Sequence, residues 1–264
     1  MNIDLKKRKA IVTGSTAGIG LAIATGLASA GAQVVVTGRT QARVDAALVT
    51  IAKEVPDARL IGLAADLGTT EGAKQLIVEV PEADILVNNL GIFEPKNFFD
   101  IPDDDWMRFF DINVMSGVRL SRHYAPGMAK RNWGRVLFLS SESAVQIPAE
   151  MVHYGMTKTA QLAVARGLAE TLAGTDVTVN SVLPGPTRSE GVGAFFSKIA
   201  TEQGVPQERV ERNFIATHRP SSLIKRLASV TEVANLCVYL ASEQASATTG
   251  SALRVDGGVV RSIL

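Results

Sequence analysis

Short, uninterrupted runs of apolar residues recur along the chain and predict buried strands. These runs are rich in Val, Ile and Leu and lack alternating polar residues, as expected of parallel strands that are covered on both faces. Six of them cover residues 10–14, 33–38, 58–66, 83–89, 134–141 and 177–185, and a last short strand is predicted over 251–257.

Longer segments between these runs have the apolar spacing of amphipathic helices. They cover residues 18–30, 40–54, 70–79, 103–131, 151–173 and 231–242. Because strands and helices alternate, we predict a parallel sheet with right-handed crossovers and helices on both faces. No linker or repeat divides residues 1–264, so we expect one α/β domain. The irregular, proline-containing segment 186–229 is expected to be a substrate lid within it.

Composition and charge exclude several classes of function. The net charge of +1 gives no broad field for nucleic acid or anionic lipid, so we expect neither nucleic-acid nor membrane partners. The single cysteine, Cys237, lies in an apolar run and is expected to be a core thiol. No secretory signal, membrane-length apolar run or metal-ligand spacing of His and Cys is present, which favours a cytoplasmic protein without a metal.

A glycine-rich turn follows the first predicted strand. Gly14, Gly18 and Gly20 have the spacing G-x-x-x-G-x-G and stand where the strand gives way to a helix. Glycines allow a pyrophosphate to approach the backbone, and the first turn of a helix offers free N–H groups. The alternative is an ordinary tight turn, but its position after the first strand favours nucleotide binding.

The end of the second strand bears on the choice between NAD and NADP. An acidic residue there would bind the ribose 2′-hydroxyl, whereas this strand ends in Gly38 followed by Arg39. Arg39 is therefore expected to pair with a 2′-phosphate, which favours NADP(H) and leaves NAD(H) possible. Asp66, after the third strand, is predicted either to contact adenine or to cap the next helix.

A tyrosine and a lysine stand four residues apart in the segment "VHYGMTK". Tyr154 and Lys158 share one helix face at this spacing, which by itself is also typical of a surface pair. Hydride transfer to a carbonyl leaves an oxygen that needs a proton, and a phenol can donate it. A neighbouring ammonium favours the phenolate, so Lys158 is expected to lower the pKa of Tyr154 from about 10.

Five motifs in order resemble the short-chain dehydrogenase/reductase family over essentially the whole chain. They are T-G-x-x-x-G-x-G from Thr13, "NNLG" at 88–91, a serine thirteen residues before Y-x-x-x-K, "PG" at 184–185 and "VDGG" at 255–258. The resemblance implies a Rossmann sheet of seven parallel strands in order 3-2-1-4-5-6-7, and commonly a homotetramer. Leu90 departs from the family, which usually has alanine there, and should place a larger side chain near the cofactor.

The resemblance also implies an active site of Asn113, Ser141, Tyr154 and Lys158. In the family, the lysine also binds the nicotinamide ribose, the asparagine holds a water of a proton relay, and the serine binds the substrate oxygen. Glu142, beside the serine, receives no role and is expected to face solvent or the lid. The residues expected to contact the cofactor are Gly14, Ser15, Thr16, Gly18, Ile19, Gly20, Arg39, Asp66, Leu67, Asn89, Gly91, Tyr154, Lys158, Pro184, Gly185, Thr187 and Ser189.

The substrate is less well defined than the reaction. Candidate residues lining its pocket are Phe93, Ile147, Met151, Phe195 and Phe196. The family includes 3-oxoacyl-(acyl-carrier-protein) reductases, which tend to carry arginines near the positions of Asn132 and Thr175. Because neither is basic here, we expect a small-molecule ketone or secondary alcohol, with the carrier-protein substrate as the alternative. A non-catalytic nucleotide-binding regulator is a further alternative, although all four site positions are intact.

Overall fold

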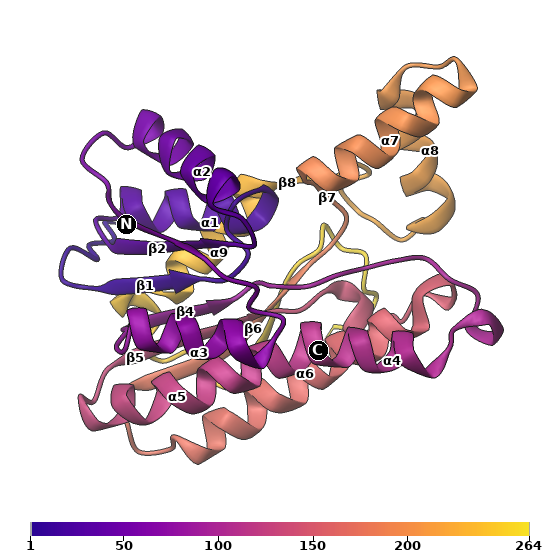
Figure 1. The fold of residues 1–264 in the computed structure, drawn as a ribbon. Coiled ribbons are helices and arrows are strands. Elements are labelled where there is room, and N and C mark those ends of the chain that lie inside the picture. The colour runs from indigo at the N-terminus through magenta and orange to yellow at the C-terminus, as the bar shows by residue number, and fades with distance from the viewer. Residues whose placement is uncertain (1, 264) are drawn as a thin grey trace.

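The computed structural model describes residues 2–263, and in these it shows a parallel sheet with helices on both faces (Figure 1). The sheet has seven strands in the order β3-β2-β1-β4-β5-β6-β9, which confirms the predicted order. The strands are β1 (Lys9–Val12), β2 (Gln33–Gly38), β3 (Arg59–Ala64), β4 (Ile85–Asn88), β5 (Gly134–Leu139), β6 (Val177–Pro184) and β9 (Ala252–Val255).

Successive residues of the central strands belong to different hydrophobic layers. Val34 and Val36 of β2 pack with one layer, while Val35 packs with the other. The first layer is completed by α1 (Gly18–Ser29), α2 (Gln41–Glu54) and α9 (Val230–Leu240), and the second by α3 (Thr70–Glu79), α5 (Ser116–Lys130) and α6 (Val152–Thr171). Apolar side chains on both faces explain why the strands lack alternating polar positions.

The helix predicted over residues 103–131 is interrupted. It consists of α4 (Asp103–Phe110), a π-helical turn η2 (Asp111–Met115) and α5. Such π-turns widen the helix locally and are frequent at functional sites. Asn113 lies within this turn and is therefore displaced from the path of a regular helix.

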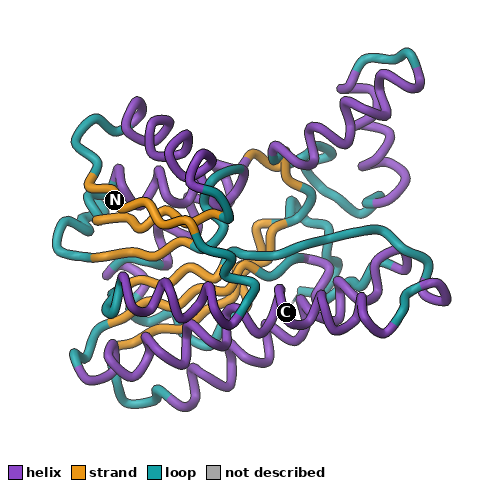
Figure 2. Tube along the Cα trace, in the orientation of Figure 1, coloured by secondary structure: helices purple, strands orange, loops and turns teal. Residues whose placement is uncertain are grey.

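The segment 186–229 is more regular than its sequence suggests. It begins with β7 (Thr187–Arg188), continues through α7 (Glu190–Gln203) and α8 (Gln207–His218), and ends with β8 (Ala228–Ser229), which pairs with β7. The two helices project from the sheet at the top right of Figure 1, and Figure 2 shows short loops joining them. They pack on their own apolar cluster of Phe196, Ala200, Val210, Ile215 and Leu227.

Short turns complete the chain. The 3-10 helices are η1 (Phe98–Asp100), η3 (Glu142–Ala144), η4 (Ala149–Met151) and η5 (Glu243–Ala245).

Among the described helices, none combines the length and apolar content that a membrane span requires.

Candidate active site

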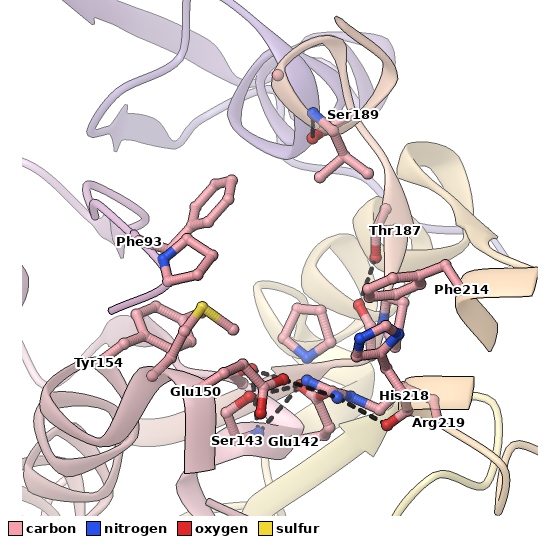
Figure 3. A pocket seen from close by; sticks show the side chains of 18 of the residues that line it. Phe93, Glu142, Ser143, Glu150, Tyr154, Thr187, Ser189, Phe214, His218 and Arg219 are labelled. Atoms are coloured by element: carbon pink, nitrogen blue, oxygen red, sulfur yellow. Dashed lines mark hydrogen bonds and ion pairs between the residues drawn. The ribbon is translucent and has the colours of Figure 1, made fainter. Parts of the chain in front are cut away.

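A cavity of about 990 Å³ opens at the carboxyl ends of β4, β5 and β6. Its walls come from these strand ends, from α6 and from the projecting helices α7 and α8. Figure 3 shows Tyr154 and Phe93 on one side of it, with Phe214 and His218 on the other. Ligand sites of open α/β sheets occupy this edge, so the cavity lies where substrate and cofactor are expected to meet.

Tyr154 and Lys158 lie one turn apart on α6 and both line the cavity. The Lys158 side chain is buried, and its Nζ atom is 5.6 Å from the centre of the Tyr154 ring. Nζ donates hydrogen bonds to the Leu139 carbonyl oxygen at 2.7 Å and to Gln161 Oε1 at 3.3 Å. The pair therefore faces the site rather than solvent, which excludes the surface-pair alternative.

Asn113 is held against α6 and the loop after β4. Its side-chain oxygen accepts a hydrogen bond from the Ile92 N–H at 2.7 Å, and its Nδ2 donates to the Ile92 carbonyl and to Thr157 Oγ1, both at 3.0 Å. Its backbone carbonyl accepts a 2.5 Å hydrogen bond from Gln161 Nε2. Gln161 thus bridges the Asn113 backbone and the Lys158 side chain.

Sequence reasoning did not single out Gln161. The residue is three positions after Lys158, so a helical projection places it on the same face of α6. Gln161 is buried, and both its Oε1 and its Nε2 atoms form hydrogen bonds. A polar residue one turn beyond the predicted catalytic lysine was the available signal.

Ser141 lies just beyond the end of β5 and caps the short helix η3. Its Oγ accepts a hydrogen bond from the Ser143 N–H at 3.1 Å and donates one to Glu142 Oε2 at 2.5 Å. Glu142 is buried and forms an ion pair with Arg219, which follows α8. Glu142 faces segment 186–229, as expected, through its contact with Arg219. Its solvated alternative is wrong because the carboxylate is enclosed by Ser141, Ser143 and Arg219.

Burial dominates the electrostatics of the pair on α6. It raises the pKa of the Tyr154 phenol well above its usual range; a hydrogen bond with Ser141 and the charge of Arg219 act in the opposite direction, and the charge of Glu142 adds to the rise. Burial also lowers the pKa of the Lys158 ammonium to about 7. The expected lowering of the phenol pKa by Lys158 is therefore outweighed in this structure, because the phenol is desolvated and the ammonium is directed at Leu139 and Gln161.

The glycine turn has the geometry that the backbone of a pyrophosphate site requires. Gly14 and Gly18 have φ values of +62° and +57°, in the left-handed region that favours glycine. A Cβ atom on Gly20 would lie 2.3 Å from the Gly14 carbonyl oxygen. Helix α1 starts at Gly18 without a side-chain cap, so its first N–H groups are directed at the turn. These features fit a dinucleotide cofactor.

The end of β4 stabilises this turn. Asn89 Nδ2 donates hydrogen bonds to the carbonyl oxygens of Thr13 and Gly14, at 2.9 and 3.1 Å. Leu90 Cδ1 lies 3.5 Å from the position of a Cβ on Gly14, so the larger side chain does pack beside the turn. Gly91 lines the cavity near Lys158 and Asn113: a Cβ on it would lie 3.4 Å from Lys158 Nζ and from Asn113 Oδ1.

The ends of β2 and β3 flank the glycine turn. A Cβ on Gly38 would lie 2.4 Å from Thr16 Cγ2, so any longer side chain at this position would collide with the turn. Arg39 follows it and is exposed, and within residues 2–263 it forms no ion pair. Asp66 is also exposed, and its Oδ1 accepts a hydrogen bond from the Gly68 N–H. The N-cap of α3 is Thr69, so the capping alternative for Asp66 is wrong.

The loop after β6 links the cavity to the glycine turn. Pro184, Gly185, Thr187 and Ser189 all line the cavity. Thr187 Oγ1 donates to the Gly185 carbonyl, whereas Ser189 caps α7 and lies 3.2 Å from the Cβ position of Gly18. Ser189 is therefore the better placed of the two hydroxyls for a pyrophosphate.

The outer wall of the cavity is mostly apolar. Phe93, Met151 and Phe196 line it as predicted, while Ile147 lies at the surface and is 48% exposed. The side chain of Phe195 is outside the part of the chain that the structure describes. Residues of α7 and α8 that sequence reasoning did not name complete the wall: Val192, Ile199, Gln203, Val210, Asn213, Phe214, Thr217 and His218.

Sheet order, glycine turn and cavity position together define a Rossmann-fold oxidoreductase that uses a nicotinamide cofactor. A family model described as Enoyl-(Acyl carrier protein) reductase matches residues 14–260. The uncharacterized oxidoreductase YvaG of Bacillus subtilis is 47% identical over 263 residues, covering 100% of both chains. The chain therefore belongs to the short-chain dehydrogenase/reductase family.

Two further similar proteins have names that indicate different substrates. The 3-oxoacyl-(acyl-carrier-protein) reductase of Aquifex aeolicus is 31% identical over 263 residues, which are 98% of this chain and 100% of that protein. L-sorbose reductase from Gluconobacter frateurii, solved with NADPH and L-sorbose, superposes with a TM-score of 0.92 at 31% identity and 100% coverage of both chains.

Proposed function

We propose that the protein is an NADP(H)-dependent carbonyl reductase that transfers a hydride between the cofactor and a small ketone or secondary alcohol. The observation that carries this proposal is the convergence of Tyr154, Lys158 and Ser141 on one cavity beside a glycine turn. A bound nicotinamide cofactor supplies or accepts the hydride. The glycine turn, Asn89 and Ser189 would hold its pyrophosphate side, and Lys158 and Gly91 border the space next to the reacting centre.

Tyr154 donates the proton in the reducing direction. Its phenol carries a proton at neutral pH, since burial raises a pKa that ordinarily already lies well above neutrality, and it points into the cavity beside Ser141. Proton donation to the carbonyl oxygen converts the ketone to an alcohol as the hydride arrives at carbon. Gln161, itself bonded to the Asn113 carbonyl, and the Leu139 carbonyl hold the Lys158 amino group in place, away from bulk water.

The cavity favours a small molecule over a protein-bound acyl chain. Its outer wall is apolar, while its floor carries Glu142, Glu150 and Arg219, an arrangement suited to a substrate with both polar and apolar parts. The neighbour that binds NADPH and L-sorbose supports a small polar ketone. The relative from Aquifex aeolicus supports the alternative, but Asn132, where an acidic carrier would meet a cation, is bonded to Asp176.

A substrate screen tests the reaction class. Purified protein is mixed with NADPH or NADH and a panel of small ketones, sugars and 3-oxoacyl thioesters, and cofactor oxidation is followed at 340 nm. We expect turnover of a small ketone with NADPH. Cofactor binding without turnover across the panel would instead favour the non-catalytic regulator.

Replacing Arg39 with Ala is expected to weaken NADP(H) selectively. A charge-assisted contact to the 2′-phosphate corresponds to about a tenfold or greater increase in Kd for NADPH, with Kd for NADH nearly unchanged. Arg59→Ala is the matched control because Arg59 binds the Lys6 and Gly31 carbonyls at the amino-terminal ends of the strands, whereas Arg39 follows the carboxyl end of β2. Equal increases in Kd for NADPH and NADH in the Arg39 variant would show that Arg39 does not contact the 2′-phosphate.

We also propose that the protein forms a homotetramer, as the family resemblance implies. Apolar side chains are exposed on η1 and α4, where Phe98 is 48%, Phe99 90% and Met107 67% accessible, and such surfaces favour association. Light scattering should give four times the chain mass of 28.0 kDa. A monomer over the micromolar range would contradict the proposal.

A further inference from the structure

An ion pair joins the floor of the cavity to the segment that carries the projecting helices. Arg219 Nε lies 2.9 Å from Glu142 Oε1, although the two residues are 77 positions apart (Figure 3). Both side chains are nearly enclosed, with 10% and 6% of their surfaces accessible. A buried pair of this kind is strongly sensitive to loss of one partner, because the other charge is left without compensation.

The second oxygen of Glu142 is committed to the site serine. Glu142 Oε2 accepts hydrogen bonds from Ser141 Oγ at 2.5 Å, from the Ser143 N–H at 3.0 Å and from Ser143 Oγ at 3.2 Å. The single hydroxyl proton of Ser141 is therefore directed at Glu142. Ser141 Oγ also accepts a hydrogen bond from the Ser143 N–H and lies beside the Tyr154 phenol.

The charges around Glu142 come from three elements. Arg219 approaches from the end of α8, and its Nη1 lies 3.5 Å from Glu150 of η4 and donates to the His218 carbonyl. Tyr154 faces Glu142 from α6, while Lys158 on the same helix is directed at Leu139 and Gln161 instead. Arg219 is thus the cation that compensates Glu142, and it is supplied by the projecting segment.

We propose that Glu142 is a positioning residue that orients the Ser141 hydroxyl, and that Arg219 holds the Glu142 carboxylate in the place where it can do so. The position of the α7–α8 segment and the orientation of the serine are then linked through one ion pair. This inference rests on the proposed function for its kinetic consequence, since Ser141 lies beside the proposed proton donor Tyr154, but its structural part is independent of any substrate.

Arg219→Met removes the cation with little change in side-chain length. Without its partner the Glu142 carboxylate is no longer fixed from the side of α8, so it no longer holds the serine proton in the same direction. We expect kcat to fall by about 10- to 100-fold, with little change in KM. Glu142→Gln should also lower kcat, and the double variant should resemble Glu142→Gln alone.

Hydrogen exchange gives a readout that needs no turnover. The Ser143 N–H is bonded to both Ser141 Oγ and Glu142 Oε2, so its exchange should accelerate in Arg219→Met and in Glu142→Gln. Arg219→Lys keeps a cation at this position, so it should retain part of the protection of the Ser143 N–H against exchange and part of the wild-type kcat. The matched control is Arg226→Met, because Arg226 also pairs with a glutamate, Glu232, but at the surface.

The outcomes separate the two proposals. Unchanged exchange at residues 141–145 together with a wild-type kcat in Arg219→Met would overturn the inference. Decreases in kcat from Glu142→Gln and Arg219→Met that simply multiply in the double variant would overturn it as well. If the wild-type protein binds NADPH but reduces no carbonyl, the proposed function fails, and the exchange measurements still decide whether Arg219 orders the serine segment. A poorly folded Arg219→Met leaves the test to Arg219→Lys and Glu142→Gln, whose exchange must then differ from that of Arg226→Met.

Discussion

Tyr154→Phe is expected to lower kcat for ketone reduction by about a thousandfold or more, while Kd for NADPH stays within about twofold of wild type. The phenyl ring keeps the packing against Phe93, whose ring centre is 6.5 Å from that of Tyr154. Only the proton donor is lost, so the alkoxide that forms as the hydride arrives has no acid beside it. Stopped-flow or steady-state assays with NADPH measure the rate, and quenching of protein fluorescence measures cofactor binding.

Tyr124→Phe is the control for removing a buried tyrosine hydroxyl. Tyr124 lies on α5, and its hydroxyl donates a 2.7 Å hydrogen bond to the Val80 carbonyl, away from the cavity. Its loss should lower the free energy of unfolding by about 1 kcal/mol and leave kcat unchanged. Near-normal activity in Tyr154→Phe would show that another group supplies the proton.

Gly20→Ala is expected to disrupt both the cofactor site and the fold around it. The new Cβ would lie 2.3 Å from the Gly14 carbonyl oxygen and 2.5 Å from Asn89 Nδ2, so the turn must open and the Asn89 hydrogen bonds must break. Overpacking of this kind lowers the free energy of unfolding by about 1–3 kcal/mol. Because the same turn is proposed to bind the pyrophosphate, Kd for NADPH should rise by at least about tenfold.

Gly167→Ala is the matched control for a glycine in a helix. Gly167 lies within α6, and a Cβ there meets no other atom within 4 Å, so alanine should stabilise the protein by about 0.5–1 kcal/mol and leave NADPH binding unchanged. Chemical denaturation and fluorescence titration measure both quantities. Wild-type stability and cofactor affinity in Gly20→Ala would show that the turn tolerates displacement and is not closely fitted to the cofactor.

Local patterns were sufficient to predict the sheet and the general position of the site. The central strands β1, β2, β4, β5 and β6 are rich in Val, Ile and Leu because they are covered on both faces, and this pattern indicates parallel strands without any knowledge of tertiary contacts. The glycine turn was recognisable because its backbone requires left-handed φ values that few residues other than glycine adopt. Spacing along one helix placed Tyr154 and Lys158 on a shared face.

The partners of Glu142 could not be predicted from local sequence patterns. Its partner Arg219 is 77 positions away, so no periodicity relates the two residues. The bridge that Gln161 makes between Lys158 and Asn113 likewise depends on how α6 packs against the π-turn. The direction of the pKa shift of Tyr154 was predicted wrongly for the same reason, because it depends on burial by neighbours from other elements.

The sequence by itself determined the alternation of strands and helices, the backbone of the glycine turn and the residue types available for proton transfer. These follow from properties of single residues and their near neighbours: side-chain shape, φ preference and helical repeat. Only the tertiary structure decided that Glu142 pairs with Arg219, that Gln161 donates to the Asn113 carbonyl and that the site is strongly desolvated. Hydrogen bonds and ionisation depend on distances between atoms that the chain brings together from far apart, and packing of the whole molecule sets those distances.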